Sequence, residues 1–308
     1  MERTKPKLIV IAGPTASGKT SLAVDLAEHF GGEIISVDSM QVYRHMDIGT
    51  AKPSKDEMRD IVHHMIDIVD PDEEFNASLY RSMAVRVIEE AIDRGKICFA
   101  VGGTGLYLKT LLRGIMKCPP ADSFLREHLK LKWEEQGPAF MHRQLERLDP
   151  EAASRIHPND RIRVLRSLEI INLTDRTITD LTGGHRFQES YYETLKLGLE
   201  MERSKLYKRI NERSFSMVDN GLIEETHSLI DMGYSTELKP MKSIGYRHAV
   251  GLLKGIWNKE KMIFEFQKDT RRYAKRQLTW FRNDHDYMWV NPDSRDLILK
   301  KVREFIDR

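Results

Sequence analysis

The chain has 308 residues, and its 49 Lys and Arg nearly balance 47 Asp and Glu, so net charge alone indicates no charged partner. No apolar run approaches the roughly 20 residues that a membrane-spanning helix needs, and the polar segment Met1–Lys7 lacks a secretory-signal pattern. The two cysteines, Cys98 and Cys118, form neither a C-x-x-C pair nor a disulfide framework. We therefore expect a cytoplasmic protein with one large or two moderate domains.

The first third of the chain alternates predicted strands and helices, which is typical of a parallel sheet covered by helices on both faces. The predicted elements are strand Leu8–Ala12, helix Lys19–Phe30, strand Glu33–Val37, helix Ser78–Arg94, strand Lys96–Val101 and helix Leu106–Leu112.

Helical periodicity alone continues through residues 122–181, with breaks at Gly137-Pro138, Asp149-Pro150 and His157-Pro158, and then Gly183-Gly184. Strand Thr194–Leu199 returns to the sheet. The predicted elements after it are helices at 203–219, 221–232 and Lys259–Asn283, and a last strand and helix within 287–307. The sequence therefore predicts an α/β core, 1–118 and 190–308, interrupted by an all-helical insertion at 119–189.

A phosphate-binding motif lies between the first strand and the first helix. Its sequence matches G-x-x-x-x-G-K-[ST] in that structural context. Small residues let backbone N–H groups surround a phosphate, and the helix N-terminus adds positive potential. Lys19 supplies a cation, and the Thr20 hydroxyl suits Mg²⁺. The motif predicts a bound diphosphate or triphosphate, with an ordinary glycine-rich turn as the alternative, and comprises Gly13, Pro14, Thr15, Ala16, Ser17, Gly18, Lys19 and Thr20.

Asp38 ends the second predicted strand, at the edge where open parallel sheets bind ligands. Its carboxylate has four interpretations: a metal ligand, a ribose-binding acid, a general base and a turn-capping side chain. The ribose interpretation is weak, because the glycine loop is not G-x-G-x-x-G. In the polar segment Asp38–Pro53 that follows, Gln41 is suited to a base edge and Tyr43 to stacking. The alternative is a structured surface loop.

A second glycine motif, Gly102-Gly-Thr-Gly-Leu-Tyr107, follows the third predicted strand and opens a helix. Its glycines permit close backbone approach to a ligand, and Thr104 directs a hydroxyl toward the same edge. A tight turn between strand and helix also requires glycine, so the motif alone is weak. His63 and His64 diverge on either a helix or a strand and lack a third ligand, so we interpret them as structural.

Basic side chains gather at four places in the second half of the chain. Arg163 and Arg166 share a helix face, with pairing to Glu169 as the alternative. Arg209 and Arg213 are spaced i, i+4 and suit a diphosphate opposite Lys19, with surface pairing as the alternative. Lys242–Arg247 places two cations around a glycine. The stretch 271–282 is basic, free of acids and interleaved with aromatics, which favours a nucleic-acid backbone, although Trp280 and Phe281 are interpreted as core.

Taken together, these motifs resemble those of bacterial-type tRNA dimethylallyltransferases (tRNA isopentenyltransferases). The resemblance covers nearly the whole chain. Ile162 departs from it, since many relatives carry Gln there. The two cysteines do not suggest the zinc-finger extension of eukaryotic relatives. The segments that carry the resemblance are GPTASGKT at 13–20, DSMQVYRHMDIGTAKP at 38–53, HHMIDI at 63–68, GGTGLYLKTLLRG at 102–114, HPNDRIRVLRSLE at 157–169, KSIGYR at 242–247 and AKRQLTWFR at 274–282.

The resemblance implies a P-loop NTPase-like fold and transfer of a dimethylallyl group from its diphosphate to N6 of the adenosine 3′ of the tRNA anticodon. It implies that the loop at 13–20 binds the allylic diphosphate, with Mg²⁺ at Thr20. Lys19, Arg209 and Arg213 would neutralise the leaving pyrophosphate, and Asp38 would act as general base. The implied contacts to the tRNA anticodon stem-loop are Asp38, Ser39, Met40, Gln41, Thr104, Arg126, Ile162, Arg163, Arg166, Lys242, Ser243, Gly245, Tyr246, Arg247, Lys275, Arg276, Gln277 and Arg282.

Two alternatives to a prenyltransferase stay open. The first is a small-molecule or nucleoside kinase in which the helical insertion serves as an Arg-bearing lid. The second is an RNA-binding NTPase that remodels RNA without a covalent product. Nothing in the sequence requires more than a monomer.

Overall fold

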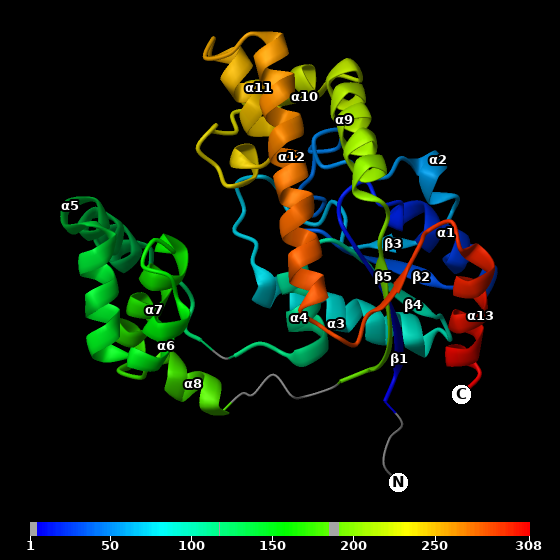
Figure 1. Ribbon diagram of the computed structural model, residues 1–308, viewed down its shortest axis with the longest axis horizontal. Helices are drawn as coiled ribbons and strands as arrows, with labels where there is room; N and C mark the ends of the chain where they lie inside the picture. Colours follow the sequence, from blue (N-terminus) through cyan, green and yellow to red (C-terminus); the bar gives the residue numbers. More distant parts are fainter. Residues whose placement is uncertain (1–4, 117, 185–190) are drawn as a thin grey trace. The chain divides into compact units, whose positions relative to one another are not determined.

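A six-stranded, wholly parallel sheet forms the centre of the computed structural model, which describes residues 5–116, 118–184 and 191–308 (Figure 1). The strands are β1 (Lys7–Ala12), β2 (Glu33–Val37), β3 (His63–His64), β4 (Cys98–Gly102), β5 (Glu193–Leu199) and β6 (Met288–Val290). Their order in the sheet is β3-β2-β4-β1-β5-β6. The central strand β1 pairs with β4 and β5, so the segments that follow β1, β4 and β2 emerge side by side.

The chain divides into two units, Met1–Leu112 with Ser190–Arg308, and Arg113–Glu189. The predicted first boundary, 118/119, lies a few residues later than this division, and the second, 189/190, lies outside the described residues. The helices of the first unit are α1 (Lys19–Phe30), α2 (Lys55–Met58), α3 (Ala77–Asp93), α4 (Gly105–Arg113, which reaches the boundary), α9 (Arg203–Asp219), α10 (Leu222–Asp231), η1 (Pro240–Lys242), α11 (Tyr246–Leu253), α12 (Lys259–Arg282) and α13 (Arg295–Ile306).

Helices cover both faces of the sheet because its strands alternate buried apolar side chains between two cores. Leu8 and Val10 of β1 belong to a core with α3, α4 and parts of α10–α12. Ile9 and Ile11 belong to the opposite core, with α1 and α13. Strands that are buried on both faces require nearly continuous apolar runs. The predicted P-loop NTPase-like class, a parallel sheet flanked by helices, is confirmed.

The second unit is all-helical, with its own small core around Leu129, Trp133 and Leu168. Two of the predicted breaks fall between its helices, and Gly137 kinks the longest helix with φ 77°. Residues 185–189 of the predicted insertion lie outside the described part of the chain. The helices are α5 (Ser123–Leu148), α6 (Pro150–Arg155), α7 (Arg161–Thr174) and α8 (Ile178–Gly184).

Four short elements escaped the sequence analysis: α2, β3, η1 and α11. Three of them are four residues or fewer, which is too short for a periodic pattern. Strand β3 is His63–His64 itself, paired with Ile34 and Ile35 at the sheet edge. In the described part of the chain, no helix is both long and apolar enough to cross a membrane.

Candidate active site

A cavity of about 450 Å³ lies in the first unit, where β1, β2 and β4 end. Loops after these neighbouring strands form its floor, and α9 and α12 contribute side chains, so residues distant in sequence meet there. The lining residues are Thr15, Ala16, Ser17, Gly18, Lys19, Thr20, Ser21, Ser36, Asp38, Gln41, Thr50, Ala51, Lys52, Pro53, Glu57, Val101, Gly102, Gly103, Arg209, Arg213, Tyr273 and Gln277.

The loop between β1 and α1 has the geometry of an anion cradle. Gly18 adopts φ 89° at the N-cap of α1, and Ala16 takes φ 64°, a left-handed conformation that L-residues rarely adopt. The Ser17 hydroxyl is fully buried and has no hydrogen-bond partner among the described residues. An unpaired buried hydroxyl is costly, so Ser17 indicates a polar ligand at this loop. Lys19 Nζ donates to the Pro14 carbonyl at 2.7 Å, folded back on the same loop.

Arg213 lies at the inner end of the cavity, and Arg209 lies nearer its rim. The Arg213 guanidinium donates to Thr15 Oγ1, which places it against the cradle. Arg209 is more exposed and lies beside Gly18, with Nη1 3.9 Å from the position of a Cβ there. The two residues lie one helical turn apart on α9 and both line the cavity beside the phosphate loop, whereas their binding of a diphosphate stays a prediction.

Three ionisable groups influence one another inside the cavity. Burial lowers the pKa of Lys19 to about 7; the Arg213 guanidinium lowers it further, and the Asp38 carboxylate opposes both effects. Burial also lowers the pKa of Arg213. Burial raises the pKa of Asp38, against the effect of its backbone hydrogen bonds and of the Lys19 and Arg213 charges. Two cations held in a desolvated site are partly uncompensated, which favours a dianionic or more highly charged ligand.

We expect pyrophosphate binding to take up a proton near neutral pH. Burial lowers the pKa of Lys19 to about 7 in the free protein, and an anion beside it would raise that pKa. Affinity should therefore fall as pH rises above about 7 toward the higher pKa of the complex. Titration calorimetry in buffers of different ionisation enthalpy measures this uptake. Lys19→Arg is the matched control, because its charge does not titrate. Equal proton uptake by both proteins would show that Lys19 is not the group that takes up the proton on binding.

Asp38 begins a turn that brings several predicted residues together. Its Oδ1 accepts hydrogen bonds from Met40 N at 2.8 Å and Gln41 N at 3.3 Å, while Oδ2 accepts none from the described residues. Thr104 Oγ1 accepts from Ser39 N at 3.1 Å, which joins the second glycine motif to this turn. The structure therefore brings these predicted residues together, and their contact with tRNA stays a prediction. Asp38 lies in the same cavity as the phosphate loop, with one oxygen available to a ligand.

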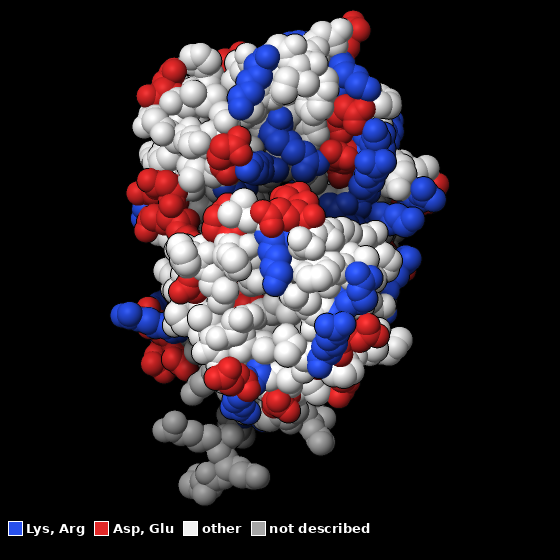
Figure 2. All heavy atoms as spheres, turned by 90° about the vertical axis from the view of Figure 1, so that its left-hand side faces the viewer, with Lys and Arg blue, Asp and Glu red and all other residues white. Residues whose placement is uncertain are grey.

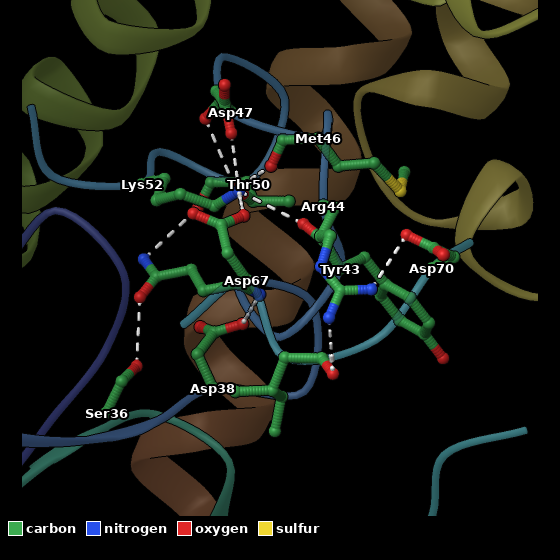
Figure 3. Close-up of polar contacts among 12 residues, drawn as sticks. Ser36, Asp38, Tyr43, Arg44, Met46, Asp47, Thr50, Lys52, Asp67 and Asp70 are labelled. Atoms are coloured by element: carbon green, nitrogen blue, oxygen red, sulfur yellow. Dashed lines mark hydrogen bonds and ion pairs between the residues drawn. The ribbon is translucent and has the colours of Figure 1, made fainter. Parts of the chain in front are cut away.

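The segment after Asp38 is a closed, internally bonded loop (Figure 3). Lys52 Nζ donates to the Tyr43 carbonyl at 3.0 Å and pairs with Asp47 and Asp67. Arg44 pairs with Asp70 at 2.9 Å. Tyr43 is 1% exposed within the core, so the predicted stacking role of its ring is wrong.

Gln277 is a second correction. It was predicted to contact tRNA, but it is buried on α12, and its side-chain amide joins two loops. Oε1 accepts from Thr15 N at 2.8 Å, and Nε2 donates to the Gly103 carbonyl at 3.0 Å. The glycines of the second motif serve this packing: a Cβ at Gly103 would lie 2.0 Å from Gln277 Nε2, and one at Gly105 would lie 2.1 Å from Trp280. Gly103 also lines the cavity, so approach to a ligand stays a prediction for it.

Tyr246 is a third correction, because it is fully buried and its hydroxyl donates to Glu225 at 2.5 Å. Gly245 is buried beside it, whereas Lys242 and Arg247 are exposed and paired with Glu237 and Asp269. Ser243 is partly buried as the C-cap of η1. Three of the four predicted tRNA contacts of α12 are cations that remain open to solvent: Lys275, Arg276 and Arg282 are exposed. The fourth predicted α12 contact, Gln277, is the buried one.

In the helical unit, two predicted tRNA contacts converge on a buried acid. Arg126 and Arg166 reach Glu169 Oε2 at 3.0 Å and 2.8 Å, and Glu169 is 1% exposed. The pairing that the sequence offered as an alternative is therefore present. Arg163 is largely exposed and lies 3.5 Å from Asp160, and Ile162 is 82% exposed.

Several cavity residues were missed: Tyr273, Lys52 and Glu57. A signal existed for Tyr273, because it precedes the buried Gln277 by four residues and so shares its face of α12. Trp280 was interpreted as core, but it is 40% exposed, so that interpretation is wrong. Lys52 and Glu57 come from a loop and a single helical turn whose folding follows no periodic pattern.

The fold and this cavity define a P-loop protein whose phosphate-binding motif lies beside an acidic side chain. The family model for IPP transferase matches residues 41–284. A tRNA dimethylallyltransferase of Geobacter sulfurreducens is 49% identical over 302 residues, 97% of each chain. A solved tRNA isopentenylpyrophosphate transferase of Bacillus halodurans is 41% identical, with TM-score 0.71 over 98% of this chain and 96% of that one. A eukaryotic dimethylallyltransferase solved acting on tRNA is 30% identical, with TM-score 0.80 over 93% of this chain and 74% of that one.

The chain belongs to the IPP transferase family. The family resemblance that the sequence motifs predicted is confirmed.

Proposed function

We propose that this protein transfers a dimethylallyl group from dimethylallyl diphosphate to N6 of the adenosine 3′ of a tRNA anticodon. The C–O bond of the allylic diphosphate breaks, the new C–N bond forms, and pyrophosphate leaves. The N6 proton passes to Asp38. Family membership supports a tRNA substrate, and the cavity supports the chemistry. The observation that supports this proposal most strongly is that the cradle, the half-buried cations Lys19 and Arg213, and the Asp38 carboxylate all line one cavity.

The cradle suits the leaving group. An allylic carbon gains cationic character as pyrophosphate departs, and negative charge grows on the departing oxygens. Lys19, Arg213 and the buried Ser17 hydroxyl all lie at the loop that would hold those oxygens. Positive groups already fixed in a desolvated site stabilise such charge without reorganising.

The amine needs the carboxylate because its lone pair is delocalised into the adenine ring. Asp38 has one oxygen held by backbone N–H groups and a second available, so it can accept the N6 proton while its turn stays in place. Gln41 lies beside it, although its amide already contacts Ser36 and the Ala51 carbonyl. To reach this cavity, the target base must leave the anticodon-loop stack.

Mg²⁺ fits the donor set of the cavity as a ligand shared with the substrate. No group of three or more His, Cys, Asp or Glu that could hold a metal gathers in the described ranges. The Thr20 hydroxyl is exposed to the cavity beside the unpaired Ser17 hydroxyl. Mg²⁺ in phosphate sites takes few protein ligands and completes its shell with phosphate oxygens and water. We propose that Thr20 would hold it, where it would add positive charge at the pyrophosphate.

The exposed basic side of α12 is proposed to bind the tRNA backbone. Acidic and basic side chains are interspersed on the face in Figure 2, so local clusters matter more than net charge. Lys275 and Arg276 are exposed and directly precede the buried Gln277, whose amide contacts the phosphate loop. Arg276 also lies over the Tyr273 ring, 5.6 Å from its centroid. A monomer and a cytoplasmic location stay predictions that agree with this role.

Neutralising Lys275 and Arg276 together as Gln is expected to weaken tRNA binding and flatten its salt dependence. Each phosphate contact contributes about 0.7 to 0.9 to the slope of log affinity against log salt. The slope from binding titrations across a salt series should therefore fall by about 1.5. Lys96→Gln with Lys300→Gln, exposed on other elements, is the matched control. An unchanged slope in the α12 variant would show that these residues do not contact phosphates.

The function is tested by offering the protein two donors in parallel, dimethylallyl diphosphate and ATP, each with unmodified tRNA and Mg²⁺. We expect pyrophosphate release with the first donor only, dependent on tRNA. Brisk ATP hydrolysis stimulated by RNA, or phosphoryl transfer to a small acceptor, would instead support the NTPase or kinase alternative.

A further inference from the structure

Glu225 on α10 binds a turn of the loop that follows Asp38. Its carboxylate accepts hydrogen bonds from three successive backbone N–H groups: Asp47 at 2.9 Å, Ile48 at 2.8 Å and Gly49 at 3.0 Å. The Tyr246 hydroxyl donates to the same carboxylate at 2.5 Å. Four donors on one side chain form a built anchor rather than an incidental surface contact.

Tyr246 also fixes the distance between this turn and α11. A Cβ at Gly49 would lie 2.4 Å from the Tyr246 ring, so only glycine fits there. Gly245, with φ 98°, packs its backbone against Gly49 as well. The sequence motif Lys242–Arg247, which was interpreted as a tRNA contact, thus holds its buried Gly-Tyr pair against the loop.

The anchored turn leads directly into the cavity wall. Thr50, Ala51 and Lys52 follow Gly49 and line the cavity. The Ala51 carbonyl accepts from Gln41 Nε2 at 3.1 Å, and the Gln41 backbone N–H donates to Asp38 Oδ1 at 3.3 Å. Backbone and hydrogen bonds therefore connect Glu225 to the carboxylate of Asp38 without interruption.

The loop needs such an anchor because its backbone is strained. His45 and Ala51 both adopt left-handed conformations, with φ 64° and 52°. Residues held in this region persist only where surrounding contacts enforce them. Lys52 binds the loop from within (Figure 3), and Glu225 binds it from outside.

We propose that Glu225, seated by Tyr246, is a positioning residue that holds the Asp38–Pro53 loop so that Asp38 faces the reacting amine. This inference rests on the proposed function. The phosphate cradle lies between β1 and α1 and Arg213 lies on α9, and the side-chain hydrogen bonds of Lys19 and Arg213 go to Pro14 and Thr15 rather than to this turn. Loss of Glu225 should therefore slow the transfer step and spare diphosphate binding.

The test replaces Glu225 with Gln, which keeps its size and loses one acceptor oxygen. Prenyl transfer at saturating substrates should fall about 10- to 10²-fold, as expected for a misplaced reacting group, while the calorimetric Kd for pyrophosphate stays within about twofold. Hydrogen exchange of the amides of residues 47–49 should quicken, and exchange at the phosphate loop should not. Glu224→Gln, exposed on the neighbouring position, is the matched control.

Tyr246→Phe removes one hydroxyl from the same anchor and guards against misfolding of the first variant. Tyr246→Phe alone should slow transfer. Added to Glu225→Gln it should cause little further loss, because substitutions of contacting residues are not additive. The positioning role would be overturned if Glu225→Gln transferred the prenyl group at the wild-type rate. It would also be overturned if this variant lost pyrophosphate affinity by the same factor as it lost transfer rate. Wild-type protein that transfers nothing would instead overturn the proposed function, and exchange at 47–49 would still show whether Glu225 anchors the turn.

Discussion

Asp38→Asn is expected to slow dimethylallyl transfer at least about 10²-fold, the lower range for loss of a general base. Asparagine keeps an acceptor oxygen for Met40 N and Gln41 N, so the turn should stay in place. It cannot take a proton from N6. Single-turnover rates at saturating donor and tRNA measure the loss, and tRNA affinity should be nearly unchanged.

The pH dependence gives a second readout of the same substitution. A general base acts only when deprotonated, so the rate should fall as pH drops through its pKa. Because burial raises the pKa of Asp38, the acid limb should lie above the range of an ordinary aspartate. The Asn variant should lack this limb. Asp38→Ala, which also removes the turn bonds, should be no more active than Asp38→Asn. A rate within about twofold of wild type in Asp38→Asn would exclude the base role.

Arg213→Met is expected to lower kcat/KM for the prenyl donor by about 10²- to 10³-fold, comparable to removing one preorganised donor at a developing charge. The Arg213 guanidinium contacts the cradle through Thr15 and is largely removed from water. Arg209→Met, nearer the rim, should cost much less, because solvent screens an exposed charge. Arg209→Met therefore serves as the matched control for Arg213→Met.

Arg213→Met should also lose more pyrophosphate affinity than Arg209→Met. Thermal unfolding of both variants checks that neither loss reflects misfolding. Equal effects of the two substitutions would contradict the assignment of Arg213 as the inner cation.

Much of the sheet and the phosphate loop could be predicted from the sequence, because both depend on local patterns. Leu8–Ala12 is apolar because β1 is buried on both faces, and the glycines and Lys19 follow it directly. Asp38 could be placed at the site because it directly follows β2, which is separated from β1 only by β4 in the sheet. Such inferences need only the spacing of apolar residues along the sequence and the geometry of parallel strands.

The errors arose where long-range packing decides the role of a polar side chain. Gln277 and Tyr246 stand in basic or polar motifs, yet each faces inward to a partner more than 20 residues away. Tyr43 sits in a polar segment, but its ring belongs to the core. No local period distinguishes a side chain that fixes a loop from one that meets RNA. Arg126 and Arg166 likewise depend on Glu169, whose burial follows from the packing of α5 on α7.

The most direct test of the account is nucleoside mass spectrometry of an unmodified tRNA transcript after incubation with the protein, Mg²⁺ and dimethylallyl diphosphate. We predict one dimethylallyl group on N6 of the adenosine 3′ of the anticodon, and almost none with Asp38→Asn. A transcript left unmodified by the wild-type protein, or modified equally by both proteins, would contradict the account.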